Sequence, residues 1–430
     1  MALGSASGQA VTVSESGSAH YGRALAIVTT LFFMWGFLTS LNDTLIPHLM
    51  QIFDLNYAQG MLVQLAFFGS YFIFALPAGK LIEAIGYKRT MVVGLAVMAL
   101  GTFLFLPAAS IASYPLFLSA QIVLAAGVTA LQVAANPYVT VLGPARTASS
   151  RLNLTQAFNS LGTTLAPYFG GAVILAGAEA LAHMTRQQQA ASVKMPYAGI
   201  GIVLLVLAAS IGVITLPRIQ TTQEFRPSGK EGNPLGSIWE HHHVWLGAIG
   251  IFTYVGAEVA IGSFLIKYME QPNIGNLTPA LASKYVALYW GGAMVGRFFG
   301  SAILQRVRTG PLVGICAIVA GLLVLVSMLS FGHIAMWSLL IVGLFNSIMF
   351  PSIFTLGTAK MGPLTGKASG LLVMAIVGGA VIPVIQGFVA DKIGIHHCFI
   401  LPVLCYAFIV YYGFLGSRPT GATAELVATE

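Results

Sequence analysis

Two acidic side chains differ from the other acidic residues because each lies inside a long apolar stretch. Asp43 follows Asn42 in the segment SLNDTLIPH (residues 40–48), and Glu258 lies in YVGAEVA (residues 254–260). A charge at the centre of a bilayer costs roughly 2.5–3.5 kcal/mol even on an insertion scale. Both carboxylates are therefore functional candidates.

We predict that Asp43 gains and loses a proton as it becomes exposed to each side of a membrane. The alternative is that Asp43 caps a helix broken before Pro47, since Asp is a good N-cap residue. Glu258 has three open interpretations: an ion-coupling acid, a sugar ligand, or a structural partner of Arg297.

Amide side chains recur in four other apolar segments. Gln132 and Asn136 are four residues apart and Gln156 and Asn159 three apart, so each pair shares one helix face. A single buried amide commonly joins two helices, but several together suit a neutral, polyhydroxylated solute. The predicted substrate site comprises Asn42, Gln132, Asn136, Gln156, Asn159, Tyr254, Glu258, Trp290 and Asn346, with Gln386 as a further buried amide and Trp35 and Tyr289 as further aromatics able to stack on a sugar.

The composition identifies the solvent of this chain. Only 8% of its 430 residues are charged and 57% are hydrophobic, with a mean hydropathy of +0.84, whereas a soluble domain is roughly 25% charged. Apolar runs recur that can span about 30 Å of hydrocarbon. We predict an all-α integral membrane protein of about twelve helices, near residues 22–43, 60–83, 90–110, 114–137, 151–177, 196–216, 244–269, 280–304, 311–331, 334–358, 367–390 and 397–416.

The longest polar stretch, residues 217–243, divides the helices into two halves and is predicted to be a cytoplasmic loop. The predicted bundles cover residues 21–216 and 244–416, flanked by an N-terminal tail (1–20) and a C-terminal tail (417–430). The first twenty residues have no hydrophobic core of a signal peptide, so we interpret them as a disordered tail.

The positive charges predict the orientation. With both termini in the cytoplasm, most of the 20 Lys and Arg residues lie in cytoplasmic segments, as the positive-inside rule requires. The other side receives only Arg186, Lys194, Lys267, Lys284 and Lys392. We therefore expect a multi-pass protein of the inner membrane.

A glycine-rich motif follows the second predicted helix. Gly79, Glu83, Gly86, Lys88 and Arg89 have the spacing GxLxExxGxKR, in which glycines allow close approach and the basic residues anchor a loop at the cytoplasmic face. This motif resembles the GxLxDxxGxKR signature of the major facilitator superfamily. The frame recurs in residues 387–394 on the opposite side, which is expected of nested inverted three-helix repeats.

The chain further resembles the fucose–galactose–glucose:proton symporter branch of that superfamily, over all the predicted helices. The segments that carry this resemblance are FFMWGFLTSLNDTLIPHL, AANPYVTVLGP, RLNLTQAFNSLG, YVGAEVAIGSFLIKY, NSIMFPSIFTLG and ASGLLVMAIVGGAVIPVIQG. The resemblance implies that Asp43 handles the proton and that Gln156 and Asn159 contact sugar.

One departure bears on the substrate. The bacterial L-fucose permease has Glu where this chain has Gln132, and an amide where this chain has Glu258. This exchange favours a glucose-type hexose over L-fucose, and leaves open which acid couples transport or whether Gln132 weakens coupling.

Together these features predict a secondary active sugar importer that works by alternating access, driven by co-transported H+ and acting as a monomer. Open alternatives are sodium coupling, L-fucose or N-acetylglucosamine as substrate, and a membrane sugar sensor without transport. We expect no enzyme and no bound cofactor or metal, because the sequence has no nucleotide-binding loop, no nucleophile paired with a base and no metal cluster. We interpret His241–His243 as an interfacial segment, and Cys316, Cys398 and Cys405 as core residues.

Overall fold

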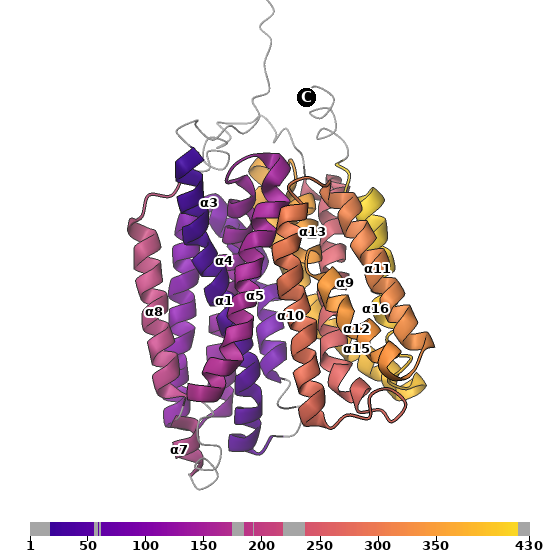
Figure 1. Cartoon of the computed structure of the whole chain (residues 1–430). Coiled ribbons are helices and arrows are strands. Elements are labelled where there is room, and N and C mark those ends of the chain that lie inside the picture. Colours follow the sequence, from indigo (N-terminus) through magenta and orange to yellow (C-terminus); the bar gives the residue numbers. More distant parts are fainter. Residues whose placement is uncertain are drawn as a thin grey trace, which may run out of the picture.

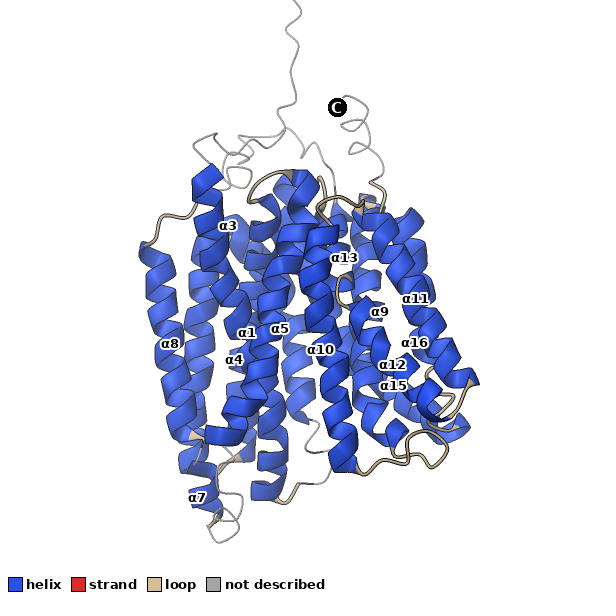
Figure 2. Cartoon of the chain, in the orientation of Figure 1, coloured by secondary structure: helices blue, strands red, loops and turns tan. Residues whose placement is uncertain are grey.

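The structure is a computed structural model that describes residues 18–55, 59, 62–173, 185–191, 193–217 and 237–419. Every regular element in these ranges is a helix (Figure 2). The predicted all-α class is therefore confirmed. Most of the predicted N-terminal tail, the centre of the predicted 217–243 loop and the C-terminal tail from residue 420 lie outside the described residues.

We refer to residues 18–217 as the N-terminal half and to residues 237–419 as the C-terminal half. The N-terminal half contains α1 (Ser18–Phe53), α3 (Leu62–Ser110), α4 (Tyr114–Val141), η1 (Ala145–Thr147), α5 (Ala148–Val173), α7 (Arg186–Ala191) and α8 (Lys194–Val213). The C-terminal half contains η3 (Ile238–Glu240), α9 (His242–Met269), α10 (Pro279–Ile303), α11 (Thr309–Leu329), α12 (Gly332–Asn346), α13 (Met349–Thr358), η4 (Gly362–Leu364), α14 (Thr365–Met374), η5 (Ala375–Val377), α15 (Gly378–Ile393), α16 (Ile400–Tyr411) and η6 (Tyr412–Gly416).

The long helices lie side by side in one bundle (Figure 1). α3 packs along α4 and α8, and α1 packs along α5. In the C-terminal half, α11 packs on α12 and α16, while α15 packs on α9. The halves meet where α5 contacts α10 and α13, and where α14 contacts α3 and α4.

The outer faces of the helices are apolar. Ile202 and Val206 of α8 are 57% and 59% exposed, and Leu322 of α11 is 55% exposed. Among the described residues, eight helices are long and apolar enough to cross a membrane. An apolar outer surface together with backbone groups bonded within helices is what a lipid environment requires.

Glycines with positive φ occupy the same position in both glycine motifs. Gly86 interrupts α3 with φ 80° and ψ 167°, and Gly394 follows α15 with φ 85° and ψ 157°. This backbone region is essentially restricted to glycine. The 49-residue α3 would measure roughly 74 Å if straight, more than twice the hydrocarbon thickness, so it comprises two apolar helices joined at Gly86. The apolar runs predict a six-residue loop here, residues 84–89, whereas in the structure the helix is interrupted at Gly86 alone.

A second interruption separates α12 from α13 at Ser347 and Ile348. In a continuous helix the Ser347 carbonyl would accept a hydrogen bond from residue 351. That residue is Pro351, which has no backbone N–H. The carbonyl of Ser347 is therefore free to accept a bond from another helix.

Candidate functional site

The predicted proton carrier lies on α1, which is helical from Ser18 to Phe53. The side chains of residues 42–48, including Asn42 and Asp43, lie outside the described part of the chain. The backbone continues through Pro47 without a break. The alternative that Asp43 caps a helix broken before Pro47 is therefore wrong, and its role as a proton carrier stays a prediction.

Glu258 lies on α9 and is 9% exposed. The hydroxyl of Tyr254, one turn earlier on the same helix, donates a hydrogen bond to Glu258 Oε1 at 2.7 Å. The ion pairs among the described residues are Lys267–Glu270 and Glu83–Lys367, so Glu258 forms none there. A buried carboxylate with a single hydroxyl partner keeps capacity for a proton or a substrate hydroxyl.

A chain of buried hydrogen bonds holds the helices around Glu258. The Tyr406 hydroxyl on α16 donates to Asn346 Oδ1 at 2.8 Å, and Asn346 Nδ2 on α12 donates to the Tyr289 hydroxyl at 3.0 Å. The Tyr289 hydroxyl on α10 then donates to the backbone carbonyl of Glu258 at 3.2 Å. Both amide atoms of Asn346 are thus bonded within the protein, which positions Tyr289 and the backbone of α9.

Trp290 is the open aromatic side chain of the predicted site. It is 42% exposed and meets the ring of Tyr289 edge to face, with centroids 5.1 Å apart. Tyr254, Tyr289 and Trp35 are 0%, 0% and 3% exposed. Of the aromatics proposed to stack on a sugar, Trp290 therefore offers the accessible ring.

Three of the predicted site amides in the N-terminal half differ in their hydrogen-bond partners. Gln132 Nε2 on α4 donates to the Tyr71 hydroxyl of α3 at 2.7 Å. Asn159 Nδ2 on α5 donates to the Phe32 carbonyl of α1 at 3.0 Å. Asn136 is fully buried, and neither its Nδ2 nor its Oδ1 has a hydrogen-bond partner. Asn136 therefore has unused hydrogen-bonding capacity one turn from Gln132.

Gln386 of α15 is also buried. Its Nε2 donates to the Ala260 carbonyl of α9 at 3.5 Å, while its Oε1 has no partner. This amide joins two helices of the same half, as the general interpretation of buried amides expects.

Arg297 of α10 connects the two groups of site residues. Its Nε donates to the Ser347 carbonyl at 3.2 Å, the same carbonyl that Pro351 leaves without a helical partner. Its Nη1 donates across the halves to the Gln156 carbonyl at 3.4 Å and to Ser160 Oγ, both on α5. Arg297 interacts electrostatically with Glu258, but its hydrogen bonds go to other groups.

Further hydrogen bonds join α5 to the C-terminal half at the predicted cytoplasmic side. Ser150 Oγ donates to the Ser301 carbonyl at 2.7 Å and Ser301 Oγ donates to the Ser150 carbonyl at 3.0 Å. Asn153 Nδ2 donates to the Arg297 carbonyl at 2.7 Å, and the Ser149 and Thr355 hydroxyls lie 2.8 Å apart. Small hydroxyl side chains thus hold the halves together where α5 begins and α10 ends.

The glycine motif supplies the second contact between the halves. Gly79 packs so closely on α14 that an added Cβ would lie 2.8 Å from the Gly366 carbonyl oxygen. Glu83 pairs with Lys367 at 3.6 Å, and Ser369 Oγ donates to the Val133 carbonyl of α4 at 2.7 Å. The basic partner of Glu83 therefore comes from the other half.

The basic end of the motif has a separate role. Lys88 Nζ donates to the Gly212 carbonyl at 2.8 Å, near the C-terminus of α8. A cation is stabilised at a helix C-terminus by the free carbonyls there. Lys88 thereby attaches α3 to α8, while Arg89 is exposed.

Sequence reasoning missed Tyr71, Tyr406, Ser160 and Ser347 as neighbours of the predicted site. Tyr71 and Tyr406 each lie in an apolar helix without polar neighbours at helical spacing. Pro351 is a signal that was available, since a proline frees the carbonyl four residues earlier. The partner of that carbonyl follows only from the packing of α10 on α12.

Comparison with known proteins agrees with this arrangement. The family model of the Major Facilitator Superfamily matches residues 25–383. A glucose/galactose transporter of Brucella abortus is 52% identical over 403 residues, covering 94% of this chain and 96% of the relative. The L-fucose-proton symporter of Escherichia coli is 35% identical, covering 95% and 97%.

A solved structure supports the same conclusion. The Escherichia coli transporter FucP, described as in the outward conformation, superposes with a TM-score of 0.84 at 34% identity, covering 93% of this chain and 100% of that chain. The fold and the relatives are those of membrane transporters and not of enzymes. The chain belongs to the major facilitator superfamily. The predicted resemblance to the branch with glucose/galactose transporters and L-fucose symporters is confirmed by these relatives.

Proposed function

We propose that this protein imports a neutral hexose of the glucose/galactose type together with a proton. The observation that carries the proposal is the 52% identity to a glucose/galactose transporter over 94% of the chain. The L-fucose-proton symporter is less similar, at 35% identity. The exchange of carboxylate and amide between Gln132 and Glu258 favours the same substrate class.

The chemistry around Glu258 suits such a substrate. Glu258 accepts from Tyr254, and Trp290 presents an accessible ring. Gln156, Asn159, Asn136 and Gln132 supply neutral donors and acceptors from the other half, and Asn42 is the proposed contact from α1. A sugar between the halves would meet hydroxyl-binding groups on both.

The proposed architecture is twelve membrane helices in two six-helix halves with nested inverted repeats. Three observations support it: α3 divides at Gly86, α12 and α13 make one interrupted span, and Gly86 and Gly394 share one backbone conformation in repeated motifs. The positive-inside rule supports an inner-membrane protein with both termini in the cytoplasm. We propose that it acts as a monomer.

In the proposed mechanism, the halves rock about a central site and expose it to each side in turn. The hydrogen bonds around Ser150, Ser301 and Arg297 close the cytoplasmic side in this conformation. Asp43 carries the proton, and the entry of one positive charge gains roughly 2.3 kcal/mol per 100 mV, about fiftyfold accumulation. No bound cofactor is needed, and sodium is the alternative coupling ion.

Counterflow in proteoliposomes tests the substrate. Vesicles preloaded with unlabelled glucose or galactose are expected to accumulate labelled sugar transiently, and L-fucose or N-acetylglucosamine to drive less uptake. Failure of both glucose and galactose, with uptake driven by L-fucose, would contradict the hexose assignment. Failure of every sugar would favour a non-transporting sensor.

Coupling is tested in the same vesicles without a preloaded sugar. A pH gradient or an inside-negative potential is expected to drive uphill uptake in choline buffer free of sodium. Uptake that appears only when sodium is restored at fixed pH would replace the proton with sodium.

A further inference from the structure

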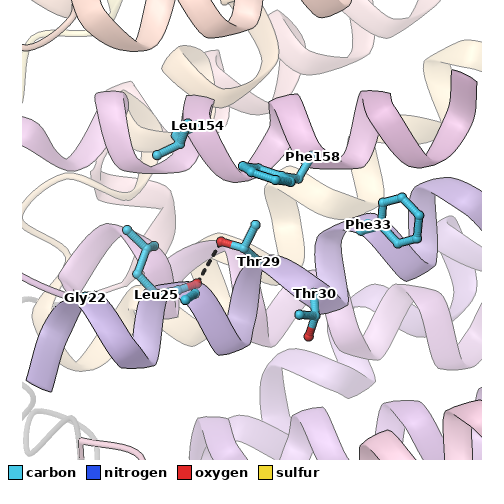
Figure 3. A pocket seen from close by; sticks show the side chains of 8 residues that line it. Gly22, Leu25, Thr29, Thr30, Phe33, Leu154 and Phe158 are labelled. Atoms are coloured by element: carbon cyan, nitrogen blue, oxygen red, sulfur yellow. Dashed lines mark hydrogen bonds between the residues drawn. The ribbon is translucent and has the colours of Figure 1, made fainter.

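An apolar groove lies between α1 and α5, outside the proposed sugar site. It has a volume of about 440 Å³ and is lined by Gly22, Leu25, Ala26, Thr29, Thr30, Phe33, Leu154 and Phe158. Figure 3 shows Leu25 and Thr29 of α1 facing Leu154 and Phe158 of α5. Phe158 also meets Phe298 of α10, which is 41% exposed. The groove therefore opens on the outer surface of the bundle, beside the seam between the halves.

The polar atoms of this groove are already bonded. Thr29 Oγ1 donates to the Leu25 carbonyl at 2.7 Å, as Figure 3 shows, and Thr30 Oγ1 donates to the Ile27 carbonyl at 2.7 Å. A threonine bonded to its own helix presents its methyl group to the surroundings. The groove thus offers hydrocarbon contacts and no directed hydrogen bond, which fits an acyl chain.

The length of the groove matches one leaflet. Its α1 residues run from Gly22 to Phe33, a rise of roughly 16 Å along a helix. The hydrocarbon core is about 30 Å thick, so one leaflet contributes about half of it. The groove begins near the N-terminal end of α1, and a groove of this length reaches about the middle of the bilayer.

A positively charged side chain lies at the end of the groove nearest the membrane surface. Arg23 is exposed and follows Gly22 directly. It precedes Thr30 by seven residues, about two helical turns, so both lie on one face of α1. Arg146, just before α5, is exposed at the same side of the bundle. The groove therefore combines apolar walls with cations at the level of lipid head groups.

We propose that this groove binds one phospholipid with an anionic head group, such as phosphatidylglycerol. The acyl chain lies between α1 and α5, and the phosphate lies at Arg23. This site is separate from the sugar site and does not depend on which sugar is carried. Because α5 also forms the hydrogen bonds that close the seam, the bound lipid packs against α5 directly beside that seam.

Lipid retention by the full-length protein tests the proposal. The protein is reconstituted in vesicles of phosphatidylethanolamine and phosphatidylglycerol at 3:1, released without added sugar, and its bound lipids are identified by native mass spectrometry. One basic residue near the membrane surface contributes about fivefold in anionic-lipid preference. We expect phosphatidylglycerol to be enriched among bound lipids by this factor over the vesicle composition.

Matched variants separate the groove from general attraction to the membrane. Arg23→Gln is expected to return the bound lipids to the vesicle ratio, and Arg23→Lys to keep the enrichment. Ala26→Phe fills the groove and should remove the retained lipid. Arg418→Gln, which removes an exposed arginine from the C-terminal half, and Ala302→Phe, at an exposed position of α10, should change neither.

Three results would overturn the proposal. Wild-type protein that retains lipids in the vesicle ratio has no anionic site. Equal loss of enrichment in Arg23→Gln and Arg418→Gln would show a diffuse charge effect. Unchanged phosphatidylglycerol retention in Ala26→Phe would place the lipid elsewhere. Sugar counterflow is a separate readout, so its failure would leave this test intact.

Discussion

At the scale of single residues, we propose that Glu258 and Asp43 have different roles, Glu258 as a sugar ligand and Asp43 as the proton carrier. Glu258 is buried, bonded to Tyr254 and without an ion pair among the described residues. Asp43 is the proposed proton carrier. A carboxylate that carries a proton must change its charge during each cycle, whereas a sugar ligand need only accept hydrogen bonds.

Asp43→Asn is expected to separate exchange from accumulation. The amide keeps a hydrogen-bonding side chain but cannot titrate, so sugar counterflow should continue while proton-driven uptake against a gradient is lost. The loss should amount to the whole of the roughly fiftyfold accumulation available at 100 mV. Wild-type accumulation by Asp43→Asn, measured in the same proteoliposomes, would exclude Asp43 as the proton carrier.

Tyr289 tests the hydrogen-bond chain around Glu258. Tyr289→Phe removes the acceptor of Asn346 Nδ2 and the donor to the Glu258 carbonyl. Leaving buried partners unbonded typically costs about 1–2 kcal/mol, so the thermal midpoint in detergent should fall. Tyr411→Phe is the control because Tyr411 is 46% exposed. Equal thermal midpoints for the two variants would show that the hydrogen bonds of Tyr289 do not stabilise the fold.

At the scale of elements, glycines decide where helices end. Gly86 converts one 49-residue helix into two, and Gly394 ends α15 with nearly the same φ and ψ. The two lie at matching positions of a motif that recurs after the proposed second and eleventh helices. Only glycine adopts this backbone conformation without strain, which explains why both copies of the motif have glycine at this position.

Gly86→Ala is expected to destabilise the protein by about 1–3 kcal/mol, because a Cβ is strained at this φ and ψ. Gly291→Ala is the matched control: Gly291 lies in α10 and an added Cβ there meets nothing within 4 Å. That substitution should be neutral or stabilising by up to about 1 kcal/mol. Thermal unfolding in detergent compares them, and a Gly86→Ala midpoint at or above the control contradicts the turn's role.

At the scale of the whole molecule, two seams hold the halves together on the proposed cytoplasmic side. One runs between α5 and α10 through Ser150, Ser301 and Arg297. The other runs between α3 and α14 through Gly79 and Gly366. Both must separate for a sugar to leave toward the cytoplasm, so substitutions at either seam should shift the population of conformations.

Gly79→Ala is expected to open the cytoplasmic side, because its Cβ would lie 2.8 Å from a backbone oxygen. The reporter is Ser149→Cys, buried in the other seam, whose alkylation should become several-fold faster in the presence of Gly79→Ala. The native Cys398 is fully buried, which shields its thiol from the alkylating reagent. Gly291→Ala serves as the control, and equal alkylation rates with both substitutions would contradict the gate.

The sequence by itself determined the helical membrane fold. Each residue that faces lipid must have an apolar side chain, so long apolar runs and few charges indicate membrane helices directly. It also selected the residues that could serve a sugar site: an isolated carboxylate or amide in an apolar helix is costly wherever the helix packs. The glycine motif also indicated the interruption at Gly86, because the motif lies between two apolar runs of the sequence.

Only the tertiary structure decided which of those polar groups bond to each other. The sequence offered Arg297 as a partner of Glu258, but its hydrogen bonds go to the carbonyl freed by Pro351 and to α5 in the other half. Asn346 bonds two tyrosines from helices far away in sequence. Such choices depend on which faces of distant helices meet. Helical periodicity shows which residues share a face, and packing alone brings two faces together.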